Sequence, residues 1–431
     1  MSIKVIKSET EVGEEDSSKL KETVQSVIST IRREGDKGVS EFTKQFDGMD
    51  IKKFILSKEE IEKKISSLEP STKELIDTNI SRIKKFADFQ MSMYREMQLE
   101  VDEGGTVLGQ RIIPINSVGV YVPAGRFPLL SSALMGIIPA KVAGVRRIVA
   151  MTPPGKKRPD PAVLYGMVKA GADEIYTIGG IQAIAAMAYG TETIKPVDKI
   201  IGPGNKFVNE AKRQVFGSVG IDLLAGPSEV LILADESACT ERVAYDLLAQ
   251  AEHDTAARSC LITDSKSLAQ EIAEKMDYYI NTLETKEILK ESWANKGSIL
   301  LCDTMNEAIE ATNEYAPEHL ELHLSFENKE LAFNKLHNYG SLFMNEDTPV
   351  VFSDKLIGTN HTLPTNRAAR YTGGLSVGVF VKILTYQEVI KKESLYNLAE
   401  RAQKQSKLEG LAGHGKSAEL RTRYRDQEII V

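Results

Sequence analysis

Residues 15 to 100 carry apolar side chains at helical spacing, with charged residues between them. The spacing is clearest at Leu20, Val24, Val27 and Ile31. Apolar residues three or four positions apart share one face of a helix. This part of the chain therefore predicts helices that pack against a core.

The pattern changes at Ser117, where short runs of β-branched residues alternate with stretches rich in Ala. The runs recur about every 25 to 30 residues, which is typical of strands separated by helices in a parallel, doubly wound α/β sheet. The expected strands are 118–122, 147–151, 174–178, 199–201 and 230–234, and the expected helices are 131–143, 161–170, 181–189 and 205–216.

A second α/β layer is expected after residue 240. A helix is predicted over 241–252, and apolar runs predict strands at 260–263, 298–302, 319–324 and 341–345. From Tyr386 onward, helix formers and charged residues dominate, and this appended segment is expected to dock on another subunit. Its residues at helical spacing are Leu395, Leu398, Ala399 and Ala402.

Composition disfavours several classes of function. The 431 residues carry a net charge of -7, with Lys and Arg spread along the chain, which disfavours nucleic-acid binding. Cys239, Cys260 and Cys302 are too scattered for a disulfide framework or a thiolate metal site and indicate a reducing compartment. The first ten residues are charged, and no apolar run is long enough to span a membrane. We therefore expect a cytoplasmic protein with more than one domain.

The segment Asp246 to His253, which reads DLLAQAEH, offers a first pair of ligand-type residues. Gln250 and His253 are three positions apart, so on a helix they share a face. A single histidine at a helix end more often has a structural role, and a metal site needs more ligands than two. The pair indicates a metal site only together with ligands from elsewhere in the chain.

The segment APEHLE (316–321) places an acid and an imidazole side by side, at Glu318 and His319. Neighbouring residues of a strand point to opposite faces, so both serve one site only at a strand start or in a turn. Pro317 favours that placement. The pair suits a reaction that needs one base for an alcohol proton and another to activate water. A loop histidine beside a solvated glutamate is the alternative.

Two further segments carry candidate ligands. Residues 353–365 read SDKLIGTNHTLPT and place Asp354, Asn360 and His361 around Gly358, with little helical or strand periodicity. Polar sites are commonly built on such loops, although Asp and Asn beside Gly are also ordinary turn residues. Near the chain end, LAGH (411–414) places His414 on the appended helical segment, where a surface histidine is the default.

The coenzyme-binding residues are less evident, because no G-x-G-x-x-G sequence opens a helix after a strand. Gly202 to Asn205 follow one expected strand and open a helix, and Gly179 and Gly180 do the same one unit earlier. Bare backbone amides at a helix N-terminus attract phosphate. Each turn alone is more often an ordinary strand-to-helix connection than a cofactor site.

Taken together, seven segments stand in one order along nearly the whole chain: VGVYVPAG (118–125), GGIQAIAA (179–186), GPGN (202–205), AGPSEV (225–230), QAEH (250–253), APEHLE (316–321) and GTNHTLPT (358–365). In these segments and their order the chain resembles the histidinol dehydrogenase family. The resemblance implies an α/β fold of two incomplete Rossmann-like, doubly wound units, similar to aldehyde dehydrogenases. It implies a division into an N-terminal arm (1–15), a discontinuous first domain (16–121 and 229–375), a coenzyme domain (122–228) and a C-terminal helical segment (376–431).

The resemblance also implies roles for residues at matching positions. One zinc ion per subunit is held by Gln250, His253, Asp354 and His414. His319 resembles the general base that takes the hydroxyl proton, and Glu318 resembles the residue that activates water. The substrate contacts are the four zinc ligands and His319, together with Ser228, His361 and Glu409, and the NAD contacts are Tyr121, Gln182 and Asn205.

The activity implied is the NAD-linked oxidation of a primary alcohol through the aldehyde to the acid, with L-histidinol as the alcohol and two NAD reduced. The family's C-terminal segment crosses to the partner subunit, which implies a homodimer with a shared active site.

Three alternatives remain at this stage. Ser353 and Lys355 depart from the family pattern around Asp354, and Arg367 and Arg370 lie in NRAARYTGG (366–374), which resembles paralogues that oxidise sulfopropanediol. One interpretation is that these cations bind the anionic tail of a substrate. The other is that they are only surface charges. A non-catalytic zinc-binding scaffold would not need the ligand and base residues together. A semialdehyde dehydrogenase with a Cys nucleophile is disfavoured because no cysteine lies in a motif.

Overall fold

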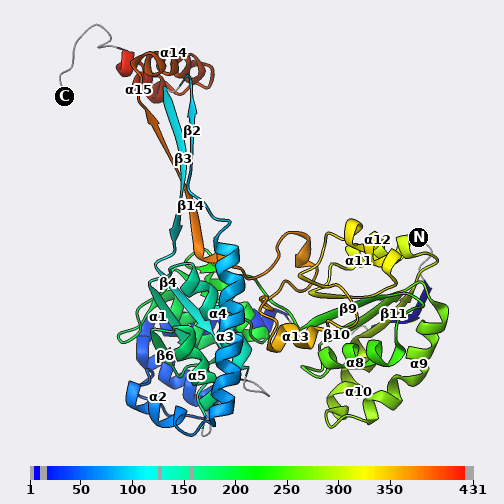
Figure 1. Ribbon diagram of the computed structural model, residues 1–431. Coiled ribbons are helices and arrows are strands. Elements are labelled where there is room, and N and C mark those ends of the chain that lie inside the picture. Colours follow the sequence, from blue (N-terminus) through cyan, green and yellow to red (C-terminus); the bar gives the residue numbers. More distant parts are fainter. Residues whose placement is uncertain (1–3, 10–16, 104, 125–128, 156–158, 423–431) are drawn as a thin grey trace. The chain divides into compact units, whose positions relative to one another are not determined.

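The computed structural model describes residues 4–9, 17–103, 105–124, 129–155 and 159–422 (Figure 1). It divides into two compact units, of which the first holds residues 1–91 and 115–380 and the second holds 92–114 and 381–431. Gly125 of the first motif, much of the expected N-terminal arm (1–3 and 10–15) and the chain end (423–431) lie outside the described residues.

A five-stranded parallel sheet forms one half of the first unit, in the order β6-β5-β4-β7-β8. Its strands are β4 (Ser117–Tyr121), β5 (Arg147–Met151), β6 (Glu174–Tyr176), β7 (Lys199–Ile201) and β8 (Gly220–Ile221). The first four confirm the strands predicted from the β-branched runs. The strand order changes direction between β4 and β7, and in open α/β sheets ligands bind where the strand order switches.

The helices of this half cover both faces of the five-stranded sheet. α1 (Ser17–Asp47) packs on α6 (Gly180–Tyr189) and α7 (Lys206–Val215), while α3 (Pro70–Met91) packs on α4 (Leu130–Val142) and α5 (Pro161–Ala170). α2 (Lys58–Ile65) contacts α5. The apolar stripe of α1, which includes Val24, Val27 and Ile31, is buried against this core.

This packing differs from the expected domain division, which grouped residues 16–121 with 229–375. β4 is a central strand of the sheet that residues 122–228 otherwise form. The helix α1 packs on the same half of the unit. The reason is that the apolar stripe of α1 is buried only against α6, α7 and the strands beside them.

A six-stranded sheet forms the other half of the first unit, in the order β1-β11-β10-β9-β12-β13. Its parallel strands are β9 (Glu229–Ala234), β10 (Arg258–Thr263), β11 (Gly297–Leu301), β12 (His319–His323) and β13 (Ser341–Phe343). β1 (Lys4–Lys7) pairs antiparallel with β11. The predicted second α/β layer is therefore confirmed.

Alternate residues of β9 bury opposite faces of this sheet. Val230 and Ile232 belong to a core with α8 (Thr240–Ala251), α9 (Lys266–Asn281) and α10 (Lys286–Lys296). Leu231 and Leu233 belong to a core with α11 (Met305–Tyr315) and α12 (Phe326–Lys335). Three short helical segments follow β13, namely α13 (Val350–Lys355), η1 (Ala368–Arg370) and η2 (Val377–Phe380).

The C-terminal segment 376–431 was predicted as helix alone, but in the second unit its first residues form a strand of an antiparallel three-stranded sheet. The sheet has the order β14-β3-β2 and consists of β2 (Met97–Val101), β3 (Thr106–Pro114) and β14 (Val381–Val389). Most side chains of β2 and β14 are exposed, so no buried face imposes the apolar alternation that reveals a strand in sequence. The helices α14 (Lys392–Leu408) and α15 (Ala412–Thr422) follow β14, and α14 confirms the helix predicted there.

Candidate active site

Glu318 and His319 lie at the start of β12, the placement that lets two adjacent side chains serve one site. The Glu229 backbone of β9 binds both of them. Its N–H donates to Glu318 Oε2 at 2.7 Å, and its carbonyl accepts from His319 Nδ1 at 3.0 Å. Because a carbonyl only accepts, Nδ1 carries the proton and Nε2 is left as the acceptor of the ring. That Nε2 is buried and has no hydrogen-bond partner among the described residues.

The charge state of His319 depends on its carboxylate neighbours. Burial lowers the pKa of the ring, but Glu318, 3.5 Å from Nδ1, and the nearby Asp354 more than compensate and raise it to about 9. In the absence of a metal ion the ring therefore holds a second proton, on Nε2, at neutral pH, and it must lose that proton before Nε2 can accept one from a substrate. Once it has done so, the ring can accept a proton during a reaction.

His253 and Asp354 approach each other, with 3.8 Å between Nε2 and Oδ2. Two ligands that are each about 2.1 Å from one zinc ion lie roughly 3 to 4 Å apart, so this pair has the spacing of a shared ion. Gln250, buried on α8, precedes His253 by three residues. An imidazole, a carboxylate and an amide oxygen are donors that zinc accepts, so the residues present fit the group.

The helix predicted over 241–252 is confirmed as α8, whereas the loop predicted around Asp354 was wrong. α8 ends at Ala251, so His253 follows the helix instead of continuing its face. The Asp254 carboxylate accepts the Ala256 N–H at 3.0 Å and forms a turn that replaces the next helical turn. Asp354 lies in α13 and not on a loop, since the short helix starts after Pro349.

The predicted substrate residues His361 and Ser228 lie on two loops that hydrogen bonds join. Gly226 N donates to Thr365 Oγ1 at 2.5 Å, and Asn366 N donates to Glu229 Oε1 at 3.1 Å. His361 Nε2 is enclosed and has no hydrogen-bond partner among the described residues. Burial lowers the pKa of His361, against the influence of the Asp354 carboxylate. The structure thus brings His361 to the same group of charges as Asp354, Glu318 and His319.

The remaining two predicted residues, Glu409 and His414, belong to the second unit. Glu409 ends α14 and accepts a hydrogen bond from Gln405 at 2.7 Å, while His414 lies exposed in the first turn of α15. Their assignment to the site therefore remains a prediction.

The predicted NAD contacts gather at the carboxyl ends of β4, β6 and β7. Tyr121 ends β4, and its hydroxyl accepts the Gly180 N–H at 3.2 Å, while burial raises its pKa to about 12. Gln182 is fully buried in α6 and donates to Asp47 at 2.9 Å. Asn205 caps α7 by accepting from the N–H groups of Phe207 and Val208. Each side chain thus has a structural contact of its own, and the NAD assignment remains a prediction.

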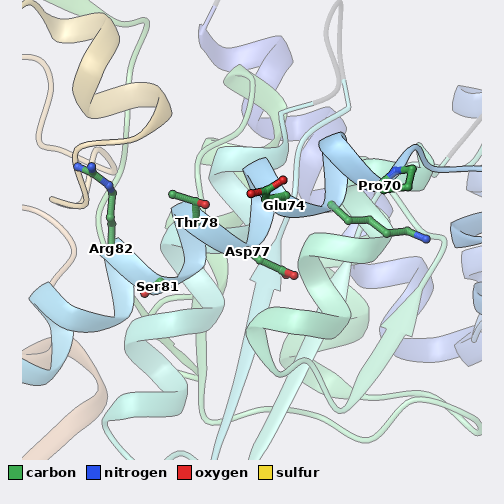
Figure 2. A pocket seen from close by; sticks show the side chains of 7 residues that line it. Pro70, Glu74, Asp77, Thr78, Ser81 and Arg82 are labelled. Atoms are coloured by element: carbon green, nitrogen blue, oxygen red, sulfur yellow. The ribbon is translucent and has the colours of Figure 1, made fainter.

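A hollow on α3 contains none of the predicted site residues (Figure 2). It is open, and one helix supplies its whole lining: Pro70, Lys73, Glu74, Asp77, Thr78, Ser81 and Arg82. The chemistry-bearing residues gather elsewhere. Among the described helices, none has the length and apolar character needed to cross a membrane.

Comparison with models of protein families shows to which family the chain belongs. The family model described as histidinol dehydrogenase matches residues 10–422. The chain belongs to the histidinol dehydrogenase family. It is therefore a member of an oxidoreductase family, and the resemblance found in the sequence is confirmed.

Individual members of the histidinol dehydrogenase family match the chain along its length. A curated "Histidinol dehydrogenase homolog" of Shouchella clausii is 45% identical over 421 residues, covering 98% of both chains. The crystal structure of histidinol dehydrogenase from Elizabethkingia anophelis has a TM-score of 0.90 at 35% identity, covering 97% of this chain and 95% of that one. A betaine aldehyde dehydrogenase from Staphylococcus aureus, with a TM-score of 0.50 at 14% identity, covering 86% of this chain and 90% of that one, shares the fold alone.

Sequence reasoning missed two features of this family member. Glu229 lies inside the AGPSEV segment, but only the register of β9 with β12 reveals that its backbone holds Glu318 and His319. The second feature is a buried group formed by Asp246, Glu321 and His323. The alternating polar residues of β12 were its signal, because an apolar strand core rarely includes three charged or imidazole side chains on one face.

Proposed function

We propose that the protein is a zinc-dependent, NAD-linked dehydrogenase that oxidises L-histidinol through the aldehyde to L-histidine. The observation that carries this is the arrangement around His319. Its Nε2 is buried and has no partner among the described residues, Glu318 lies 3.5 Å from its Nδ1, and the candidate ligands His253 and Asp354 lie within 3.8 Å of each other. A base, a second acid and a metal-binding pair are what two successive oxidations at one carbon need.

The proposed ligands of the zinc ion are Gln250, His253, Asp354 and His414. Zinc, when bound, orients the substrate hydroxyl and polarises the oxygen at the reacting carbon. A set of nitrogen and oxygen donors without thiolate leaves room for such an exchangeable position.

His319 is the proposed base of the first oxidation. Its Nε2 takes the hydroxyl proton while NAD accepts the hydride, which gives the aldehyde and one reduced coenzyme. The Glu229 carbonyl holds Nδ1–H throughout, so the ring cannot rotate away or change tautomer without losing that bond.

Glu318 is the proposed base for the water that attacks the aldehyde. Adding water gives the hydrate, from which His319 takes a proton as a second NAD accepts the second hydride. His319 releases its first proton to solvent before it takes the second, so that one alcohol, one water and two NAD+ give one acid, two NADH and two protons. The Glu229 N–H fixes the carboxylate of Glu318 for this step.

The carboxyl edge of the five-stranded sheet is the proposed NAD site. Tyr121 ends β4 and the Gly202 to Asn205 turn follows β7, and these two strands flank the change in strand order. Gly202 has a φ of 111° and lies against the Tyr121 carbonyl, which leaves no room for a side chain. Glycine at this position therefore lets the turn after β7 pack directly on the end of β4.

A homodimer with a shared active site is proposed from the second unit. Its sheet and helices expose large apolar side chains, and Leu408 is 89% exposed. None of the described residues of α15 is buried. Apolar area of this extent needs a covering surface. We propose that a second copy provides it and receives Glu409 and His414 in return.

The cations near the site favour histidinol over a sulfonated alcohol. Lys355, Arg367 and Arg370 are all exposed, and Arg370 donates back to the Arg367 carbonyl at 3.1 Å. In a single copy these three side chains are exposed, and the contact of Arg370 is to backbone, so they enclose no anion site there. The sulfonate-oxidising alternative loses its support from these residues.

The test is a substrate panel with the zinc-loaded full chain. L-histidinol and 2,3-dihydroxypropane-1-sulfonate are each supplied with NAD, and NADH and the acid product are measured. We expect two NADH per L-histidinol and none with the sulfonate. Turnover of the sulfonate alone would transfer the assignment to that substrate, and zinc binding without turnover of either would leave the scaffold alternative.

A further inference from the structure

A buried group of two carboxyls and one imidazole lies beside the proposed site and has no role in the proposed chemistry. His323 Nε2 lies 3.3 Å from Glu321 Oε2 and 3.5 Å from Asp246 Oδ2. Glu321 and His323 are fully buried, and the side chain of Asp246 is 17% exposed. Burying such groups is costly unless each has a partner. The group, called here the Asp246 cluster, therefore needs an explanation.

The Asp246 cluster and the proposed site are carried by the same two elements, α8 and β12, and the cluster lies about one helical turn from the site along each of them. Asp246 precedes Gln250 by one helical turn of α8, and Glu321 follows His319 by two positions on the same face of β12. Both steps correspond to about 6 to 7 Å. The cluster and the site are thus neighbouring layers between one helix and one strand.

The third element of the site, α13, is attached to the cluster directly. Glu321 Oε1 accepts the backbone N–H of Val350, the first residue of α13, at 2.6 Å. Asp354 follows Val350 by one helical turn and so lies again one layer above. α13 has six residues and no side-chain cap of its own. A helix this short depends on outside contacts for its position.

The hydrogen bonds already made argue that the cluster is a link and not a second metal site. Both oxygens of Glu321 have partners, Val350 N–H on one side and His323 Nε2 on the other. The same Nε2 faces Asp246. A metal ion would have to displace the imidazole from both carboxyls.

We propose that the Asp246 cluster is a positioning device, in which Glu321 fixes α13 to β12 and thereby sets the position of Asp354 opposite His253. The expected effect on zinc affinity rests on the proposed function, since Asp354 is a proposed zinc ligand. The claim that Glu321 holds α13 in place does not depend on zinc. Groups that hold metal ligands typically change metal affinity by about 10- to 100-fold when they are removed.

The test compares Glu321→Ala, Glu321→Gln and a control in the metal-free full chain. Gln keeps an oxygen for the Val350 N–H, whereas Ala does not. Asp235→Ala is the matched control, because Asp235 is also buried and accepts a backbone N–H, that of Ser325, at the opposite end of β9 and β12. Hydrogen exchange of residues 350–355 is measured in each variant.

We expect faster exchange of α13 in Glu321→Ala, protection close to wild type in Glu321→Gln, and no change at α13 in Asp235→Ala even though this variant is less stable. Unchanged protection in Glu321→Ala, or an equal loss in the control, overturns the proposal. This outcome does not depend on whether the chain binds zinc.

Zinc affinity, measured by competition with a chelator, tests the consequence. We expect the dissociation constant to rise about 10- to 100-fold in Glu321→Ala and to stay within a few-fold of wild type in the other two variants. A wild-type chain that binds no zinc refutes the proposed function, while the exchange result still decides the positioning role. A second zinc equivalent that His323→Gln removes would make the cluster a metal site and overturn the proposal.

Discussion

The backbone of a single residue, Glu229, orients the two proposed bases. The Glu229 backbone uses its N–H for Glu318 and its carbonyl for His319, so two neighbouring side chains of β12 are oriented by one residue of β9. Backbone groups cannot be removed by substitution, which makes this arrangement independent of the side chain at position 229. The chemistry at His319 can therefore be changed without losing the geometry.

His319→Asn is expected to abolish NADH formation and to leave zinc content unchanged. The Asn amide can still donate to the Glu229 carbonyl, but it cannot accept a proton, so the loss is that of the base. Loss of a general base lowers the rate by about 100- to 10,000-fold. Steady-state rates and metal analysis on the same preparation check this. Near wild-type turnover would remove His319 from the role.

The Glu229 side chain predicts a pH dependence of stability. Burial raises the pKa of its carboxyl to about 7, against the opposing hydrogen bond from the Asn366 N–H. The folded protein thus holds this proton more tightly than the unfolded chain, whose carboxyl has the ordinary pKa of 4.5. The contribution to stability is complete below pH 4.5 and is lost as pH rises through 7, amounting to about 3 kcal/mol in total.

Glu229→Gln isolates that contribution, because Gln keeps an acceptor for Asn366 without a charge. Urea unfolding at pH 5 and pH 8, at one protein concentration, should show the wild type losing more stability over this interval than the variant. Parallel losses in the two proteins would show that the carboxyl is ionised throughout and contradict the prediction.

At the scale of elements, strands with buried side chains could be predicted from the sequence, and strands with exposed side chains could not. β4, β5, β7 and β9 were predictable because buried parallel strands are continuous apolar runs. β2 and β14 were not, since their side chains are mostly exposed and carry no alternation. α13 was missed for another reason, namely that six residues are too few for a helical period to be recognised.

A buried ion pair joins the elements around the proposed NAD site. Lys212 on α7 lies 2.5 Å from Asp222, and both side chains are almost fully buried. Lys212 also donates to the Gly202 carbonyl at 2.9 Å, and Asp222 accepts the Gly202 N–H at 2.8 Å. Both polar backbone groups of the glycine that opens the turn after β7 are thus held by one pair.

Lys212→Met is expected to destabilise the fold by about 3 to 5 kcal/mol, because it leaves an uncompensated buried carboxylate. Adding Asp222→Asn should recover part of that loss, since Asn keeps an acceptor for Gly202 without the charge. Lys275→Met is the control, as its pair with Glu271 has the same 2.5 Å separation but is half exposed. The free energy of unfolding of the three variants is measured by chemical denaturation. Equal effects at Lys212 and Lys275 would contradict the role of burial.

At the scale of the whole molecule, the candidate site is assembled from segments that sequence order keeps far apart. Gln250 and His253 could be related by spacing, and so could Glu318 and His319. The approach of His253 to Asp354 could not, because it depends on the order of β9, β12 and β13 in the sheet and on the path of the chain into α13. The resemblance to a family supplied that link before the fold did.

The last two proposed site residues pose a question that only an assembly answers, namely whether Glu409 and His414 act in their own copy or in a partner. Two inactive variants distinguish these cases. His319→Asn inactivates the first unit, and His414→Asn inactivates the second. In a hybrid dimer of the two chains, a shared site pairs one intact first unit with the intact second unit of the other copy.

Co-expression with two different tags isolates this hybrid. If the site is shared, the hybrid regains about half of the wild-type activity, because one of its two sites contains no substitution. If each chain serves itself, both sites of the hybrid carry one substitution and no activity returns. Each homodimer alone must be inactive for the comparison to hold. An active His414→Asn homodimer would remove His414 from the site altogether, and with it the reason for the second unit to reach a partner's zinc.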